Sequence, residues 1–239
     1  MASRRRILVP VAVVLVVLTV AALGGYRLMS SRTFQLFGGL VDRVDTTEKV
    51  VALTLDDGPS GLTPEVLQTL EDADVPVTFY VTGRELEERP ELGRAMVEAG
   101  HELGNHTASH RRMIFVGGGT VAEEIEHTDA AIRAAGFDGE ITFRPPYGKK
   151  LVALPRYLAD HDRTTVMWDV EPDSEAADTD TIVRTALEQT RPGSIVLLHV
   201  MYPSRATSLA AIPGIVDGLR AKGYRFVTVS ELLGMRDAD

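Results

Sequence analysis

Residues 50–59 read VVALTLDDGP, an apolar run that ends in two adjacent carboxylates, a glycine and a proline. The β-branched and aliphatic residues at 50–55 predict a buried strand, and Gly58 and Pro59 predict the turn that ends it. Asp-Gly-Pro alone is ordinary turn chemistry. Two neighbouring aspartates repel each other, however. Asp56 and Asp57 are therefore either part of a solvated turn or half of an active site.

Similar apolar runs alternate with helical patterns along the rest of the chain. Strands are predicted at 50–55, 77–81, 102–105, 141–143, 165–168, 194–198 and 225–229, and helices at 63–73, 90–99, 120–135, 151–161, 179–190 and 207–222. Strands that alternate with helices pair in parallel, and apolar strands indicate a sheet covered on both faces. Seven such units predict an α/β fold built as a closed or nearly closed barrel.

Capping residues and helix breakers support several of these boundaries. Thr63 precedes Pro64 at the first helical position, and Thr120 with Glu123 predicts a capping box. Helices are expected to stop at Gly100, Gly136 and Gly223.

Composition narrows the function. The 239 residues carry a net charge of −9, which argues against a nucleic-acid partner. There is no cysteine. Disulfides and thiolate zinc sites are therefore excluded, and any metal must be held by histidine and carboxylate.

The N-terminus predicts export. Arg4, Arg5 and Arg6 precede an uncharged apolar stretch at 7–26, which is long enough to cross ~30 Å of hydrocarbon as a helix. The excess of arginine before it places a cytoplasmic tail at 1–6, a single-pass anchor at 7–26 and the rest outside the cytoplasm. A cleaved signal peptide with a small-residue site near Ala22 is the competing interpretation. Residues 27–48 are expected to be a linker and 49–235 the catalytic domain.

Polar residues gather where the predicted strands end, which is where parallel α/β barrels bind ligands. These residues are Asp56 and Asp57 after the first strand, His106 and His110 after the third, RPPYG (144–148) after the fourth, Asp169 after the fifth and His199 after the sixth. Each motif alone is also compatible with a turn, a core histidine or a stiff loop, but their convergence favours an active site. His101, His127 and His161 are interpreted as non-catalytic.

The residue types in this set indicate a chemistry. Two imidazoles and one carboxylate form a three-ligand site that leaves a position for water, as in hydrolytic zinc sites, and the same triad holds Fe(II). The adjacent aspartates then have separate tasks: one ligates the cation and the other stays free as a general base. A histidine on another strand can serve as the opposing general acid. The pattern predicts metal-assisted hydrolysis of an acyl group.

Taken together, the motifs resemble those of the polysaccharide deacetylases of carbohydrate esterase family 4, the NodB-homology domain. TLDDGP (54–59) is similar to the first motif, GHELGNHTASH (100–110) to the second, RPPYG to the third and LLH (197–199) to the fifth, within roughly residues 49–233. The resemblance implies a distorted (β/α)7 barrel, here expected to follow an N-terminal transmembrane helix.

The resemblance also implies residue roles. Asp56 would be the catalytic base, with Arg144 holding it in place, and Asp57, His106 and His110 would be the metal ligands. Tyr147 would contribute its backbone N–H to an oxyanion hole, Leu198 would wall the acetyl pocket, and His199 would be the general acid. The metal is expected to be zinc, with cobalt or iron as alternatives.

The fourth motif departs from the family pattern. An Asp-Trp pair usually follows the fifth strand, whereas here residues 168–175 read WDVEPDSE. Asp173 is the expected substitute for the missing acid, ahead of Asp169, and loss of the tryptophan of that pair predicts a more open acetyl pocket.

The expected function is removal of N-acetyl groups from amino sugars of a cell-envelope or extracellular polysaccharide, such as peptidoglycan or a chitin-like polymer, with release of acetate. The predicted partners are this acetylated glycan and the membrane. Two alternatives stay open: the same fold acting on another C–N or ester bond, such as O-acetyl groups of xylan, or a catalytically silent carbohydrate-binding domain.

Overall fold

The apolar run at 50–56 forms β2 (Val50–Asp56), the central strand, and every one of its side chains is buried. The computed structural model describes residues 2–175 and 178–235, with side chains from residue 14 onward. β2 pairs in parallel with β3 (Thr78–Val81), β6 (Ser194–His199) and β7 (Arg225–Val227), and β3 pairs in parallel with β4 (Glu102–Asn105). The predicted parallel pairing is confirmed.

Single bridges extend this sheet into a ring. Phe143 forms parallel bridges with Asn105 of β4 and with Thr165 of β5 (Thr165–Val166), and Val170 bridges Val196 of β6. The chain from 165 to 170 therefore connects the two outer sides of the sheet. The ring is irregular, because Phe143 and Val170 join their neighbouring strands through single bridges instead of full ladders.

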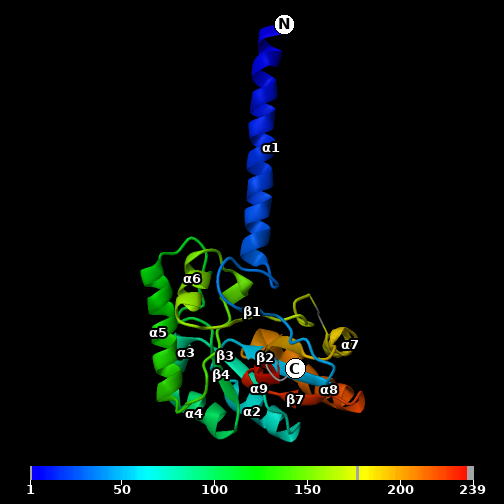
Figure 1. Cartoon of the computed structure of the whole chain (residues 1–239). Coiled ribbons are helices and arrows are strands. Elements are labelled where there is room, and N and C mark those ends of the chain that lie inside the picture. The colour runs from blue at the N-terminus through cyan, green and yellow to red at the C-terminus, as the bar shows by residue number, and fades with distance from the viewer. Residues whose placement is uncertain (1, 176–177, 236–239) are drawn as a thin grey trace.

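Helices surround the ring (Figure 1). They are α2 (Thr63–Asp72), α3 (Gly83–Glu88), α4 (Pro90–Glu98), α5 (Gly118–Ala134), α6 (Ala153–Asp160), α7 (Thr179–Gln189), α8 (Ala206–Ala221) and α9 (Val229–Gly234), with short 3₁₀ turns η1 (Pro146–Gly148) and η2 (Pro203–Arg205). As predicted, Gly100, Gly136 and Gly223 follow the ends of α4, α5 and α8. All three have positive φ angles, which glycine adopts without a steric penalty.

Alternation along β2 separates an outer core from an inner one. Val51, Leu53 and Leu55 pack in the cluster that includes residues of α2 and α8, whereas Val50 and Ala52 pack with Tyr80 in the barrel interior. Because successive strand side chains point to opposite faces, Asp56 continues the inward-facing set. The hydrophobic pattern of this strand thus directs a carboxylate into the mouth of the barrel.

Several predicted boundaries differ from the structure. Residues 141–143 form no strand of their own and join the sheet only through the bridges of Phe143. The predicted capping box at Thr120 is wrong, because α5 begins two residues earlier, with Gly117 at its N-cap. A capping box does occur at Thr228 and Glu231, where α9 begins inside the predicted strand at 225–229.

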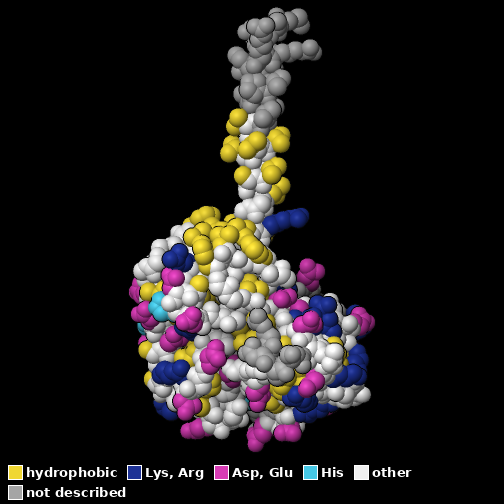
Figure 2. All heavy atoms as spheres, in the orientation of Figure 1, with side chains coloured by type: hydrophobic (Ala, Val, Ile, Leu, Met, Phe, Trp, Pro, Cys, Tyr) yellow, Lys and Arg dark blue, Asp and Glu magenta, His cyan; other side chains and the backbone are white. Residues whose placement is uncertain are grey.

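The N-terminal helix α1 (Ala2–Ser30) projects from the ring of strands and helices (Figure 1). Its described side chains begin at Val14, and apolar ones are exposed along it (Figure 2). The prediction of a transmembrane helix at 7–26 is corrected: no helix in the described part of the chain is long and apolar enough to cross a membrane. The predicted tail at 1–6 and residues 7–13 lie outside the described side chains.

The segment that follows α1 differs from the linker expected at 27–48. Its first residues complete α1, and Leu40–Val41 forms β1, which pairs in parallel with β5. Val44 is fully buried, and its backbone N–H donates to the carbonyl of Gly193 at 3.0 Å. This segment is therefore packed against the barrel.

Candidate active site

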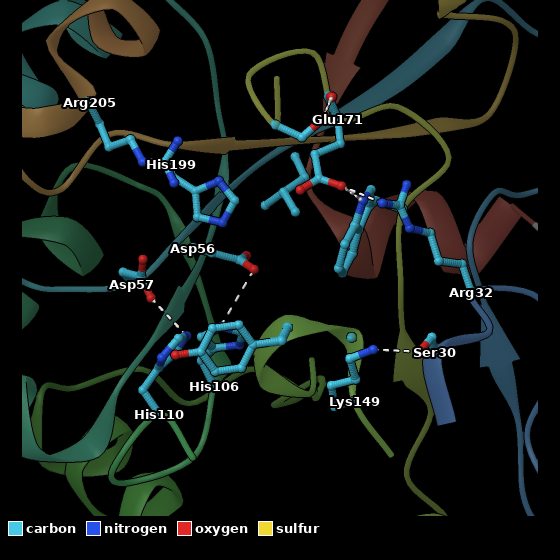
Figure 3. Close-up of a pocket in the computed structure, with 15 residues that line it drawn as sticks. Ser30, Arg32, Asp56, Asp57, His106, His110, Lys149, Glu171, His199 and Arg205 are labelled. Atoms are coloured by element: carbon cyan, nitrogen blue, oxygen red, sulfur yellow. Dashed lines mark hydrogen bonds and ion pairs between the residues drawn. The ribbon is translucent and has the colours of Figure 1, made fainter. Parts of the chain in front are cut away.

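A pocket of about 480 Å³ opens at the carboxyl ends of the strands (Figure 3). Its volume lies within the range of small-molecule sites. It is lined by Asp56, Asp57, His106, His110, Tyr147 and His199 from the predicted set. Arg144 lies beneath it, in contact with Asp56.

The two aspartates of the opening motif have different surroundings. Asp56 ends β2 and is 2 % exposed, whereas Asp57 has a φ of 78°, which redirects the chain after the strand. One oxygen of Asp57 lies 3.2 Å from Nε2 of His110. Asp56 faces Arg144 and His106 instead. The turn thus gives the neighbouring carboxylates separate partners.

A potential metal site lies beside these carboxylates. One ligand atom each from Asp57, His106 and His110 lie within 4.8 Å of one another. Nδ1 of His106 is 2.8 Å from the carbonyl oxygen of Arg144, an arrangement that places the proton on Nδ1 and leaves Nε2 free as a ligand. Burial lowers the pKa of His106 against the opposing effect of the Asp56 and Asp57 carboxylates. A neutral imidazole is the form that a metal binds, so this donor set fits a divalent cation.

His110 is brought to the site by a loop. The HxxxH spacing would place both histidines on one face of a helix, but residues 106–110 are not helical, and Thr107 and His110 have positive φ angles of 67° and 54°. The His106 and His110 rings lie 5.0 Å apart between centroids. The backbone turn at 106–110, and not helical periodicity, brings the His106 and His110 rings together.

Arg144 neutralises and orients Asp56 from below. It is fully buried, and its guanidinium donates to Asp56 Oδ1 at 2.6 Å and to Thr54 Oγ1 at 2.8 Å. Its Cζ lies 4.0 Å from the centroid of the Tyr80 ring. Buried charges are stabilised only when they are paired and hydrogen-bonded, and this arginine provides both for Asp56.

His199 faces the pocket from β6 and has a carboxylate partner, Asp173. One oxygen of Asp173 accepts the backbone N–H of His199 at 2.8 Å and the hydroxyl of Ser208 at 3.0 Å, while the other is 3.5 Å from His199 Nδ1. Burial would lower the pKa of His199, but the carboxylates of Asp173, Asp56 and Asp57 outweigh it and raise the pKa. Asp169 is directed elsewhere and binds Ser194 and the N–H of Ile195.

Tyr147 lies in η1, at the rim of the pocket. Its φ is 58°, and its side chain is 52 % exposed. The ring centroid is 4.7 Å from that of His110, and Cζ of Arg112 lies 4.2 Å above the ring. The side chain thus covers a potential metal ligand while the backbone bends sharply at the pocket.

The expected role of Leu198 does not fit the structure. Leu198 is fully buried in the outer core, and it is Leu197 that lines the pocket. The reason is strand alternation: His199 faces the pocket, so the residue two positions earlier does so as well. Applying the same period to LLH would have identified Leu197 from the sequence.

The pocket also contains residues that sequence reasoning did not identify. Trp168, Glu171 and Lys149 line it, together with Ser30 and Arg32 from the N-terminal segment. Trp168 supplies an aromatic wall to the pocket, and the more open acetyl pocket expected from loss of the Asp-Trp pair stays a prediction. Ser174, directly after Asp173, also lines the pocket.

The three other histidines lie away from the pocket lining. His101 is buried against Phe79, His127 pairs with Glu87 at 2.9 Å, and the His161 ring stacks on Tyr157. Their interpretation as non-catalytic stays a prediction.

Fold and site together define a class: an α/β protein whose parallel strands end in a pocket with a potential histidine–carboxylate metal site. Residues 43–166 match the family described as "Polysaccharide deacetylase". A chitooligosaccharide deacetylase of Sinorhizobium fredii is 35 % identical over 77 % of this chain and 92 % of its own length. A peptidoglycan-N-acetylglucosamine deacetylase of Bacillus cereus is 33 % identical over 80 % and 91 %.

The likeness extends to three dimensions. The structure of a family 4 carbohydrate esterase from Streptomyces lividans, in complex with acetate, superimposes with a TM-score of 0.69 at 35 % identity, covering 77 % of this chain and 93 % of that one. The chain belongs to the polysaccharide deacetylase family. Enzymes of this family depend on a metal, and the site above contains suitable ligands.

Proposed function

We propose that this enzyme removes N-acetyl groups from the amino sugars of a polysaccharide outside the cytoplasm, with peptidoglycan and chitin-like chains as the substrate class. The relatives named above act on peptidoglycan N-acetylglucosamine and on chitooligosaccharides, both polymers of N-acetylated sugars. The observation that carries the proposal is the arrangement of Asp56 and His199 in one pocket with the Asp57–His106–His110 set.

Asp57, His106 and His110 would hold the cation. Two imidazoles and a carboxylate suit zinc best, and cobalt or Fe(II) can occupy the same donor set. The chemistry that a divalent metal supplies when bound there is Lewis-acid activation of water and of a carbonyl oxygen. The hydrogen bond from His106 Nδ1 to the Arg144 carbonyl fixes the ring, which orients its Nε2 ligand atom.

Asp56 would act as the general base. It is buried, paired with the Arg144 guanidinium, and outside the ligand set. It takes a proton from the water that attacks the acetyl carbonyl carbon. Because Arg144 bonds Oδ1, the second oxygen, Oδ2, is the one directed to His106 and the pocket.

His199 would act as the general acid. When the C–N bond of the tetrahedral species breaks, the departing sugar nitrogen must gain a proton, and His199 donates it while acetate leaves. Asp173 holds the imidazole through Nδ1, so Nε2 is free for this donation. Tyr147 is proposed to direct its backbone N–H to the oxyanion, and Leu197 with Trp168 to enclose the acetyl group.

The test is acetate release from a panel containing acetylated chitooligosaccharides, peptidoglycan and acetylated xylan. We expect acetate from the two N-acetylated substrates, and none from either after chelation. Acetate from xylan alone would assign the enzyme to O-acetyl groups. Absence of acetate from the whole panel, with metal bound, would contradict the proposed function.

A further inference from the structure

Residues 26–32, which end α1 and continue beyond it, reach the pocket. Ser30 and Arg32 line the same cavity as Asp56 and His199. Figure 3 shows both on the side of the pocket opposite Asp57, with Arg32 near Glu171 and Ser30 near Lys149. A segment expected to be a linker is thus part of the site's wall.

Contacts with Lys149 and Lys150, the two residues that follow η1, hold this segment in place. Lys149 Nζ donates to the hydroxyl of Ser30 and lies 4.6 Å from the centroid of the Tyr26 ring. Lys150 is 1 % exposed, and its Nζ donates to the carbonyl of Ser31. Its backbone N–H also donates to the carbonyl of Met29 at 3.1 Å. These contacts hold the chain up to Ser31 and so fix the position of Arg32, the residue that follows it.

Arg32 and Trp168 share one acceptor, Glu171. The Arg32 guanidinium pairs with Oε2 of Glu171, and the indole N–H of Trp168 donates to the same oxygen at 2.8 Å. Cζ of Arg32 lies 4.6 Å from the centroid of the Trp168 ring. The Glu171 side chain is 16 % exposed and the Arg32 side chain 43 %, so the carboxylate is shielded while the guanidinium is partly open to solvent.

Trp168 in turn contacts the residue that supports the proposed base. Cζ of Arg144 lies 5.5 Å from the Trp168 ring centroid, and the same guanidinium bonds Asp56. The Trp168 ring is therefore held through its N–H by Glu171 and lies close to two guanidinium groups. Removing Arg32 leaves Glu171 without this cation and opens one side of the indole.

We propose that Arg32 is a positioning residue, which fixes Trp168 as a wall of the sugar pocket through Glu171 and through stacking, and that the segment at 26–32 is part of the substrate site. The statement that the wall contacts a sugar rests on the proposed function. Since Arg32 contacts neither Asp56 nor the metal ligands, its loss should weaken substrate binding more than it slows chemistry.

The experiment uses the full chain, in which Trp168 is the single tryptophan. Intrinsic fluorescence therefore reports this residue alone. In Arg32→Gln we expect greater quenching by acrylamide and a red-shifted emission, because the indole, 5 % exposed in the native chain, gains access to solvent. Arg27→Gln is the matched control, since Arg27 lies on the same segment but outside the pocket lining. Arg32→Lys restores a charge without the planar stack and should fall between the two.

Kinetics on an acetylated chitooligosaccharide form the second arm. Arg32→Gln should raise KM by roughly three- to tenfold with kcat changed far less, as expected for one cation–π contact and one ion pair. Unchanged quenching, or an equal change in Arg27→Gln, would overturn the positioning role. Altered quenching with unchanged KM would overturn the proposal that Trp168 is a wall of the sugar pocket. If the native chain releases no acetate at all, the proposed function fails, while the fluorescence arm still decides whether Arg32 holds Trp168.

Discussion

Asp173 binds His199 twice, accepting its backbone N–H at 2.8 Å and lying 3.5 Å from its Nδ1. The carboxylate is 3 % exposed and is further held by Ser208. Burial opposes ionisation of Asp173, but its hydrogen bonds and the charge of His199 prevail and lower its pKa. The pair therefore favours a charged carboxylate beside a protonated imidazole.

This pairing predicts a pH effect. A general acid must be protonated, and the raised pKa of His199 extends that state to higher pH. Asp173→Asn removes the largest favourable interaction, so the pKa of His199 falls and the alkaline limb of the pH–rate profile moves to lower pH. Asp169→Asn is the control, because Asp169 binds Ser194 and Ile195 instead. An alkaline limb that stays in place in Asp173→Asn would show that another group governs His199.

The metal site predicts a selective loss of metal. Asp57→Ala, His106→Ala and His110→Ala should each lose the bound cation by elemental analysis, because each removes one of three protein ligands. His127→Ala should retain it, since His127 pairs with Glu87 on the helical surface. Chelation should abolish acetate release, and zinc or cobalt should restore it. Full activity after metal removal would disprove the assignment.

The adjacent aspartates are predicted to differ in phenotype. Asp56→Asn keeps the shape of the side chain but removes the base, so turnover should fall by ~10²–10⁴ with metal content unchanged. His199→Ala should behave similarly. The measurement pairs kcat with metal stoichiometry in each variant. If Asp56→Asn empties the metal site, the roles of Asp56 and Asp57 are reversed.

Alanine variants of Leu197 and Leu198 are predicted to lose similar stability but to differ in acyl selectivity. Both are buried, and truncation to alanine should destabilise either variant by about 2–5 kcal/mol. Only Leu197→Ala enlarges the pocket, so it alone should raise the rate on propionyl relative to acetyl substrates. Thermal unfolding and the two relative rates check this. An equal change of selectivity in Leu198→Ala would place the outer residue in the acyl site.

Because His101 is buried, the folded protein is predicted to lose stability in acid. Burial lowers its pKa to about 4, whereas an unfolded histidine has a pKa of about 6.5. The unfolded state therefore binds more protons between these values, and the free energy of unfolding falls as the pH drops through this window, by up to about 3 kcal/mol at pH 4. His101→Gln should flatten this dependence in denaturant titrations, and the exposed His161→Gln should not. Identical slopes in native and His101→Gln chains would refute it.

Much of the site follows from the sequence because of one topological fact. Strands that run in parallel end at the same rim, so polar residues that follow successive strands meet there even when they are distant in the chain. This places Asp56, His106, Arg144 and His199 together without any knowledge of side-chain geometry. The same reasoning confirmed the parallel sheet, since apolar strands that alternate with helices have few other arrangements.

Only the tertiary structure decided which segments without a shared local pattern are in contact. The ion pair of Arg32 with Glu171 spans 139 positions, and no periodicity connects them. The sequence already favoured Asp173 over Asp169 as the partner of His199, but the bonds that hold Asp173, from the His199 backbone N–H and the Ser208 hydroxyl, depend on the path of the loop after Trp168. Local sequence sets which face a side chain takes within its own strand, but which distant segment then packs against that face depends on the free energy of the whole fold.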